Sequence, residues 1–138
     1  MTEALDGFVM VALSDGMIVY ISESIHKHLG LFQSEHIGFS MYDLILEEDH
    51  QEVKMAITKA ETDAMSRLST KGSVSCSFFC RMKCSRFKIA NTVMKSPGYK
   101  LVFVSGHFKL SDSDPYLVSI VRPVSPPCLL YTSDAADE

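Results

Sequence analysis

The segment from Phe8 to Ile21 contains two strand-like runs that meet at Asp15-Gly16, and the first run is apolar on both of its faces. Successive side chains of an extended strand point to opposite faces. One alternating set of the first run is Phe8, Met10 and Ala12, and the other is Val9, Val11 and Leu13. Because neither set is polar, neither face is suited to lie against water. A fold that contains this strand therefore has to cover both of its faces.

The Asp15-Gly16 pair predicts a tight hairpin turn between the two runs. Turns of the primed type need a positive φ at both central residues, which glycine adopts freely and aspartate tolerates. The two runs are therefore expected to be neighbouring strands of an antiparallel sheet.

Helical signals follow the hairpin, and further strands follow the helices. A short helix is expected at Ile25 to Leu29, ended by Gly30, and a short turn is expected after Ser40. Apolar residues at helical spacing predict a long helix over residues 49–68; they are Val53, Ile57, Ala60, Ala64 and Leu68. Three strands are expected at 74–84, 99–109 and 115–123, with a loop at 85–98. This order predicts an α+β fold, a five-stranded antiparallel sheet with short helices and one longer helix on one face.

Length and charge limit the classes of function. The chain has 138 residues, of which 46% are hydrophobic, and this is enough for one globular domain with its own core. The formal net charge of -4 argues against direct binding of nucleic acid, which depends on clustered Lys and Arg. No apolar run approaches the roughly 20 residues that span a bilayer, so no membrane partner is expected.

Three of the four cysteines, Cys76, Cys80 and Cys84, repeat every four residues. On a helix this spacing would stack the thiols and suggest a metal site. On a strand it also places them on one face, but neighbouring thiols are then about 13 Å apart at roughly 3.3 Å per residue. The paired phenylalanines of this segment favour a strand. Buried, reduced thiols are therefore expected, and no bound metal.

The histidines raise two chemical alternatives. His26 and His28 could serve as haem ligands or could equally be solvated, and His50 beside Asp49 is expected to fix the start of the long helix. No nucleophile elbow, phosphate loop or metalloprotease spacing is present in the sequence. We therefore expect that the chain is not an enzyme and that it binds no cofactor.

Several separated motifs resemble the first PAS domain (PAS-A) of animal bHLH-PAS transcription factors. They are ALDGFVMVALSDGMIVYISESIHKHLG, SMYDLILEEDHQEV, FFCRMK and YKLVFVSGHF, in the family's order over roughly residues 3 to 124. The combination of SESIHKHLGLFQ, SMYDLI and PGYKLVFVSGHF most resembles the branch of neuronal PAS domain protein 4 and insect dysfusion. One departure is Glu47, which stands where the family commonly has proline. An acid is also favourable at a helix start, so the helix is expected to persist.

The resemblance implies a PAS fold and a nuclear parent protein that pairs with a bHLH-PAS partner of the ARNT or tango type. That parent would contact DNA through a bHLH region, which does not precede Met1, so the chain is expected to be a fragment. Residues 1–6 are expected to be the remnant of an N-terminal helix or a linker, and 7–124 the PAS domain. The tail, 125–138, is expected to be non-native or disordered, because CLLYTSDAADE resembles a translated sequencing adapter. Cys128 then carries no functional weight.

Two classes of function remain open. In the first, one sheet face packs on the helices and the other docks onto a partner's PAS domain or a swapped N-terminal helix. The candidate interface residues are Phe8, Val9, Val11, Leu13, Val102, Val104, Phe108, Leu117 and Val121. The sequence does not fix which alternating set of side chains faces inward. In the second class, a cavity between sheet and helices binds a small molecule. Bulky residues favour a filled interior instead; they are Phe78, Met82, Leu101 and Phe103.

Overall fold

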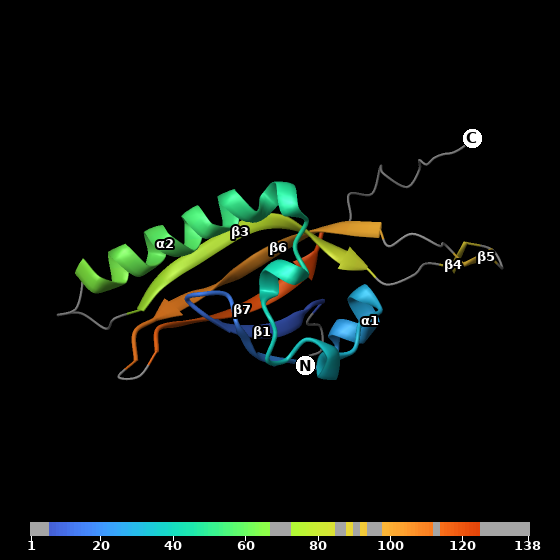
Figure 1. Cartoon of the computed structure of the whole chain (residues 1–138), viewed down its shortest axis with the longest axis horizontal. Helices are drawn as coiled ribbons and strands as arrows, with labels where there is room; N and C mark the ends of the chain where they lie inside the picture. The colour runs from blue at the N-terminus through green and yellow to red at the C-terminus, as the bar shows by residue number, and fades with distance from the viewer. Residues whose placement is uncertain are drawn as a thin grey trace.

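Five strands form the main sheet in the order β2-β1-β7-β6-β3, and every neighbouring pair is antiparallel. A computed structural model describes residues 6–66, 73–84, 88–89, 92–93, 98–111 and 114–124. The strands of this sheet are β1 (Phe8–Leu13), β2 (Ile18–Ile21), β3 (Ser73–Cys84), β6 (Gly98–Lys109) and β7 (Tyr116–Pro123). Figure 1 shows the twisted sheet with the helices lying between β2 and β3 along the chain. The predicted α+β fold is confirmed.

The loop of the β1–β2 hairpin is one residue longer than predicted, because it begins at Ser14. The Gly16 N–H donates to the Leu13 carbonyl (2.8 Å), and the Leu13 N–H donates to the Met17 carbonyl (2.9 Å). The loop therefore has three residues, 14–16, and Gly16 takes the positive φ of 99° that such loops place at their last position. Asp15 shapes the loop through its carboxylate, which accepts a hydrogen bond from the Met17 N–H (2.9 Å). The sequence signal predicted the hairpin correctly but not the length of its loop.

The helical elements are α1 (Ile25–Leu29), η1 (Gln33–Glu35), η2 (Met41–Asp43), η3 (Glu47–Asp49) and α2 (His50–Ser66). Gly30 ends α1 with a left-handed backbone (φ 73°), and its N–H donates to the His26 carbonyl. The Ser40 hydroxyl accepts a hydrogen bond from the Tyr42 N–H (3.1 Å) and so caps η2. The predicted short helix and capped turn are confirmed. The long helix is confirmed from His50 to Ser66, and residues 67 and 68 lie outside the described residues.

Helix α2 runs alongside β3 and covers the inner side of the sheet (Figure 1). Its predicted apolar stripe is buried at Val53, Ile57, Ala60 and Ala64. Leu68, the fifth member of that stripe, lies outside the described residues. In the part of the chain that the structure describes, no helix is both long enough and apolar enough to cross a membrane.

The connection predicted as a loop at 85–98 contains a short ladder of its own. β4 (Lys88–Ile89) pairs antiparallel with β5 (Thr92–Val93), and Gly98 already belongs to β6. The other residues of this connection lie outside the described residues. The sequence thus predicted the connection but missed the two-residue strands within it.

One hydrophobic core fills the space between the sheet and the helices. Its largest fully buried side chains include Phe8, Phe108, Met10, Ile18, Ile21, Ile25, Met41, Leu44, Met82 and Leu117. Met82 and the partly buried Phe78 fill this interior as expected. The expectation is wrong for Leu101 and Phe103, because their strand positions point to the other side of the sheet and Leu101 is 42% exposed. Gly106 permits close strand packing, since a Cβ there would lie 2.0 Å from the Val118 carbonyl oxygen.

Candidate functional site

The alternation of side chains gives the sheet two faces of different character. Six of the nine predicted interface residues lie on the inner face and are fully buried; they are Phe8, Val102, Val104, Phe108, Leu117 and Val121. The prediction that these six form a docking surface is wrong, because they build the core beneath the helices. The remaining three, Val9, Val11 and Leu13, lie on the opposite face and are partly exposed. We call this second surface the open face.

One half of the open face is aliphatic and lies on β1 and β7. The strand register places Val9 opposite Ile120, Val11 opposite Val118, and Leu13 opposite Tyr116. All six side chains are partly exposed. Directly opposed apolar side chains of neighbouring strands contact one another, so these pairs form a continuous surface. We call the set Val9, Val11, Leu13, Val118 and Ile120 the aliphatic half.

The other half of the open face is aromatic and cationic and lies on β3, β6 and the end of β7. The rings of Phe79 and Phe103 pack with centroids 4.7 Å apart. The guanidinium carbon of Arg122 lies 5.8 Å from the Phe103 centroid, within the range of a cation–π contact. Phe79 is 56% exposed although it is a large apolar side chain. We call Phe79, Leu101, Phe103 and Arg122 the aromatic half; none of these four is among the nine residues predicted from the sequence for an interface.

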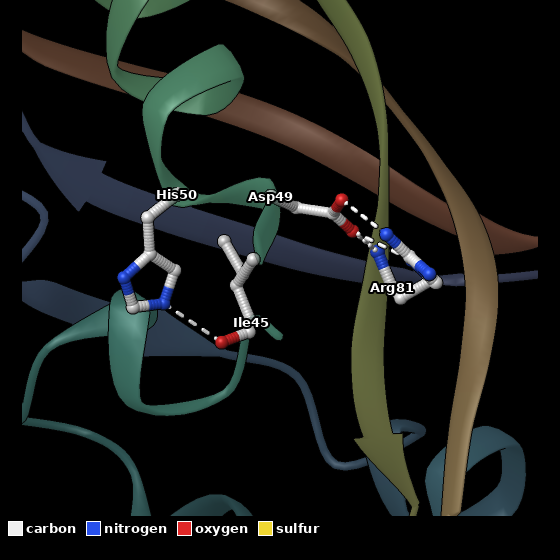
Figure 2. Close-up of polar contacts among 4 residues, drawn as sticks. All are labelled: Ile45, Asp49, His50 and Arg81. Carbon is white, nitrogen blue, oxygen red and sulfur yellow. Dashed lines mark hydrogen bonds and ion pairs between the residues drawn. The ribbon is translucent and has the colours of Figure 1, made fainter. Parts of the chain in front are cut away.

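Asp49, directly before α2, forms an ion pair with Arg81 of the edge strand β3 (Figure 2). The Asp49 carboxylate accepts hydrogen bonds from the Arg81 backbone N–H (2.8 Å), Nε (3.0 Å) and Nη2 (2.7 Å). Next to it, the Leu46 N–H donates to the Arg81 carbonyl and the Lys83 N–H donates to the Leu44 carbonyl. These contacts satisfy backbone groups that an edge strand would otherwise leave unpaired. The side-chain hydrogen bond from Arg81 is the main reason that the pKa of Asp49 is lowered.

The turn before α2 is held by His50. Its Nε2 lies 2.8 Å from the Ile45 carbonyl oxygen (Figure 2), and its ring meets Tyr42 edge-on with centroids 5.2 Å apart. Lys54 Nζ lies 5.3 Å from the same tyrosine ring. Burial raises the pKa of Tyr42 to about 12, so it is an uncharged packing group at neutral pH. This geometry agrees with the predicted role of His50 in fixing the helix start.

Comparison with known proteins identifies the family. Residues 1–83 match the family described as PAS fold. The chain belongs to the PAS family. This PAS domain is 42% identical over 108 residues to Single-minded homolog 2 of Mus musculus, covering 78% of the chain and 16% of that protein. It is 34% identical over 113 residues to hypoxia-inducible factor 1-alpha of Bos taurus, covering 81% of the chain and 14% of that protein.

Solved structures agree with this fold. The PAS-B domain of Drosophila melanogaster Cycle superposes with a TM-score of 0.55 at 16% identity, covering 85% of this chain and 99% of that one. A variant of the same PAS-B domain gives a TM-score of 0.59 at 14% identity, with the same coverage.

The sequence relatives are bHLH-PAS transcription factors and not enzymes, and this PAS domain is homologous to them. The chain spans about a sixth of the length of these relatives.

The three cysteines of β3 lie on the inner face of the PAS domain. Cys76, Cys80 and Cys84 are all buried, reduced thiols, as the strand interpretation predicted. Burial raises the pKa of all three, in Cys80 to about 12. Their thiols are therefore protonated at neutral pH. Cys128 lies outside the described residues.

The two histidines considered as haem ligands have protein partners. The His26 ring stacks on Phe32 with centroids 4.7 Å apart. The His28 ring lies 6.5 Å from that of Phe8, and burial is the main cause that lowers its pKa. Among the residues that the structure describes, no three His, Cys, Asp or Glu side chains converge in a way that could hold a metal ion.

Proposed function

We propose that this PAS domain is a dimerisation module, the PAS-A domain of a bHLH-PAS transcription regulator, and that the open face is its pairing surface. The observation that carries the proposal is the aliphatic half of that face. Its side chains are aligned by strand register on the side of the sheet that points away from the core. Apolar side chains gathered on one exposed surface mark interaction sites in water-soluble proteins.

The parent protein is a nuclear regulator that pairs with a bHLH-PAS partner of the ARNT or tango type. DNA is contacted through the bHLH region of the parent, in keeping with the net charge of -4 of this chain. The motifs around residues 22–33, 40–45 and 97–108 support the branch of neuronal PAS domain protein 4 and dysfusion. The PAS-A domain is assigned to residues 7–124, which leaves 1–6 and 125–138 outside it.

Packing of the interior supports this proposal over a small-molecule sensor. The positions under the helices are occupied by large side chains with no exposed surface, among them Phe8, Met10 and Phe108. A ligand of ordinary size would have to displace several of them. The free energy of burial of such side chains, about 1.5–3 kcal/mol each, opposes that displacement.

The test places charges at the centre of the open face and measures binding to the purified PAS-A domain of an ARNT-type protein. The double variant Val11→Glu/Val118→Glu puts two carboxylates on a paired position of β1 and β7. We expect the dissociation constant to rise at least about 100-fold, because both charges would be buried without partners in the complex. Isothermal titration calorimetry measures this change.

The control variant is Met55→Glu/Met65→Glu. It introduces the same charge at two large apolar side chains, which are 61% and 57% exposed but lie on α2. Its affinity is expected to match the unmodified chain. If the open-face variant is folded by circular dichroism and still binds with unchanged affinity, the open face is not the pairing surface.

A further inference from the structure

The two halves of the open face differ in chemistry, although they belong to one continuous sheet. The aliphatic half offers no hydrogen-bond donor or charge from its side chains. The aromatic half combines the stacked rings of Phe79 and Phe103 with the guanidinium of Arg122. Exposed aromatic side chains beside an arginine have the composition of binding hot spots, whereas aliphatic surface mainly excludes water.

The charged side chains at the outward positions of the main sheet share one sign. All charged side chains at outward strand positions are basic; they are Arg81, Lys83, Lys109 and Arg122. The acids at the start of α2 lie close to one of these cations: the hydrogen bond from Asp49 raises the pKa of Arg81, and the charges of Glu48 and Glu52 raise it further. The chain as a whole is acidic, with a formal net charge of -4. The sign of charge on the strands of the open face is therefore opposite to that of the whole molecule.

Arg122 lacks an acidic partner within the described part of the chain, whereas Arg81 is already paired with Asp49. Asp15 and Asp114 lie at the far end of β1 and β7, since Leu13 pairs with Tyr116 there. Glu23 lies in the turn after β2, where the neighbouring Ser24 hydroxyl donates to the Gly7 carbonyl, and it forms no ion pair with Arg122 within the described residues. Asp6, near the Arg122 end of the sheet, interacts with His28 of α1. Arg122 thus presents an exposed cation beside the Phe103 ring on the aromatic half.

We propose that the aromatic half is the specificity element of the interface, and that it takes a carboxylate-bearing side chain of a different protein chain between Arg122 and the Phe79–Phe103 pair. This proposal rests on the proposed function, because it names the chemistry of the partner that the open face accepts. A guanidinium held by an aromatic ring loses little side-chain entropy when it binds, and it matches a carboxylate in two hydrogen bonds. The aliphatic half contributes area, and the aromatic half selects the partner.

The test measures how the charge at residue 122 affects binding to the purified PAS-A domain of an ARNT-type protein. Arg122→Glu is compared with Lys59→Glu, which makes the same charge change at an exposed position of α2. We expect Arg122→Glu to raise the dissociation constant at least about tenfold at low salt, since close charge pairs at interfaces couple strongly. The effect should shrink at 0.5 M salt, because screening weakens it. Lys59→Glu should change the affinity less than about twofold.

A charge swap identifies the partner group. Each exposed acid of the probe is changed to lysine in turn, and one of these changes is expected to weaken binding of the unmodified chain and to restore binding of Arg122→Glu. Loss of affinity no larger than that of Lys59→Glu overturns the proposal. When Arg122→Glu has no larger effect than Lys59→Glu, the variant Val11→Glu/Val118→Glu distinguishes two outcomes. If it abolishes binding, the open face is the pairing surface but Arg122 does not bind a carboxylate of the partner. If it leaves binding unchanged, the proposed function is also wrong.

Sedimentation of the chain alone distinguishes a second copy from a different partner. The unmodified chain is expected to remain monomeric at micromolar concentration. Self-association that Arg122→Glu abolishes would make a second copy the occupant of the aromatic half and would overturn the proposal of a different chain.

Discussion

The inner and open faces of the sheet are made from the same strands but obey different physical constraints. In β6, Val102 and Val104 have no exposed surface, whereas Leu101, which precedes Val102 in the strand, is 42% exposed. The inner residues are held by side chains from the helices of the same chain. The outer residues are equally apolar, and the strand register places them beside outer residues of the neighbouring strands. Apolar character alone therefore does not reveal which face belongs to the core.

The largest test of this comparison is a charge placed on each face. Val104→Glu is expected to unfold the domain or to lower its free energy of unfolding by more than about 4 kcal/mol, because a carboxylate would be buried among apolar side chains. Val118→Glu, on the open face of the neighbouring strand β7, is expected to cost about 1 kcal/mol, mainly through lower strand propensity. Urea denaturation followed by circular dichroism measures both values.

Equal destabilisation by the two variants would contradict the assignment of the faces. A large effect of Val118→Glu alone would reverse it. The pair is informative because the substitutions are chemically identical and the strands that carry them are hydrogen-bonded neighbours.

The strands themselves were predictable, but their orientation was not. Period-two alternation separates Val102 and Val104 from Leu101 and Phe103, yet both sets are apolar and either could face inward. Only β3 carries a polar set, with Ser75 and Arg81 among it, and this set does lie outside. The orientation of β3 determines which side chains of β6 and β7 face inward only when the register between these strands is known. That register depends on backbone pairing between segments that are distant in the sequence.

The contact between Asp49 and Arg81 shows a second limit of the sequence. The two residues are 32 positions apart, and neither lies in a motif that indicates an ion pair. The helix start at Asp49 and the strand at Arg81 were each predicted, but the edge geometry that brings them together arises only when α2 packs on β3. The loop of the hairpin was similarly one residue longer than predicted, because the backbone pairing ends at Leu13 and Met17 and leaves Ser14, Asp15 and Gly16 in the loop.

The second test concerns the edge where helix and open face meet. Asp49→Ala removes three hydrogen bonds to Arg81 and should lower the free energy of unfolding at pH 7 by about 1–2 kcal/mol, since the arginine is 48% exposed and partly screened. Arg81→Ala should cost less, because the backbone N–H of residue 81 still donates to Asp49. Denaturant titration of both variants measures the difference.

The stabilisation by Asp49 should depend on pH in a defined direction. Its pKa in the folded chain is lowered, first by the side-chain hydrogen bond from Arg81, so it lies below the unfolded value of about 4. The contribution is therefore complete above about pH 5 and is lost as the pH falls through the lower folded pKa. The stability gap between the unmodified chain and Asp49→Ala should close in that acidic window. A gap that stays constant to pH 2 would show that the ion pair does not stabilise the fold.

The last test compares thiols at inner and outer positions of β3. Of the changes proposed here, it is expected to have the smallest effect on stability. Cys76 and Cys80 are inner and buried, whereas Ser77 is outer and exposed. Burial raises the pKa of Cys80 to about 12, and only the thiolate reacts with alkylating reagents. At pH 8 the thiol of Ser77→Cys, with an ordinary pKa of about 8.5, should be alkylated at least about a hundredfold faster than Cys80.

Mass spectrometry of the digested protein reads each cysteine separately, so the rates at Cys76 and Cys80 serve as internal controls for Ser77→Cys in the same sample. The substitution of a hydroxyl by a thiol at an exposed strand position should leave the unfolding free energy unchanged within about 0.5 kcal/mol. Rapid labelling of Cys80 in the native chain would mean that the thiols of β3 point outward and that the two faces have been assigned the wrong way round. If Cys80 is alkylated slowly in the native chain and rapidly at the urea concentration of the unfolding midpoint, its thiol is buried in the folded core, as the assignment of the inner face requires.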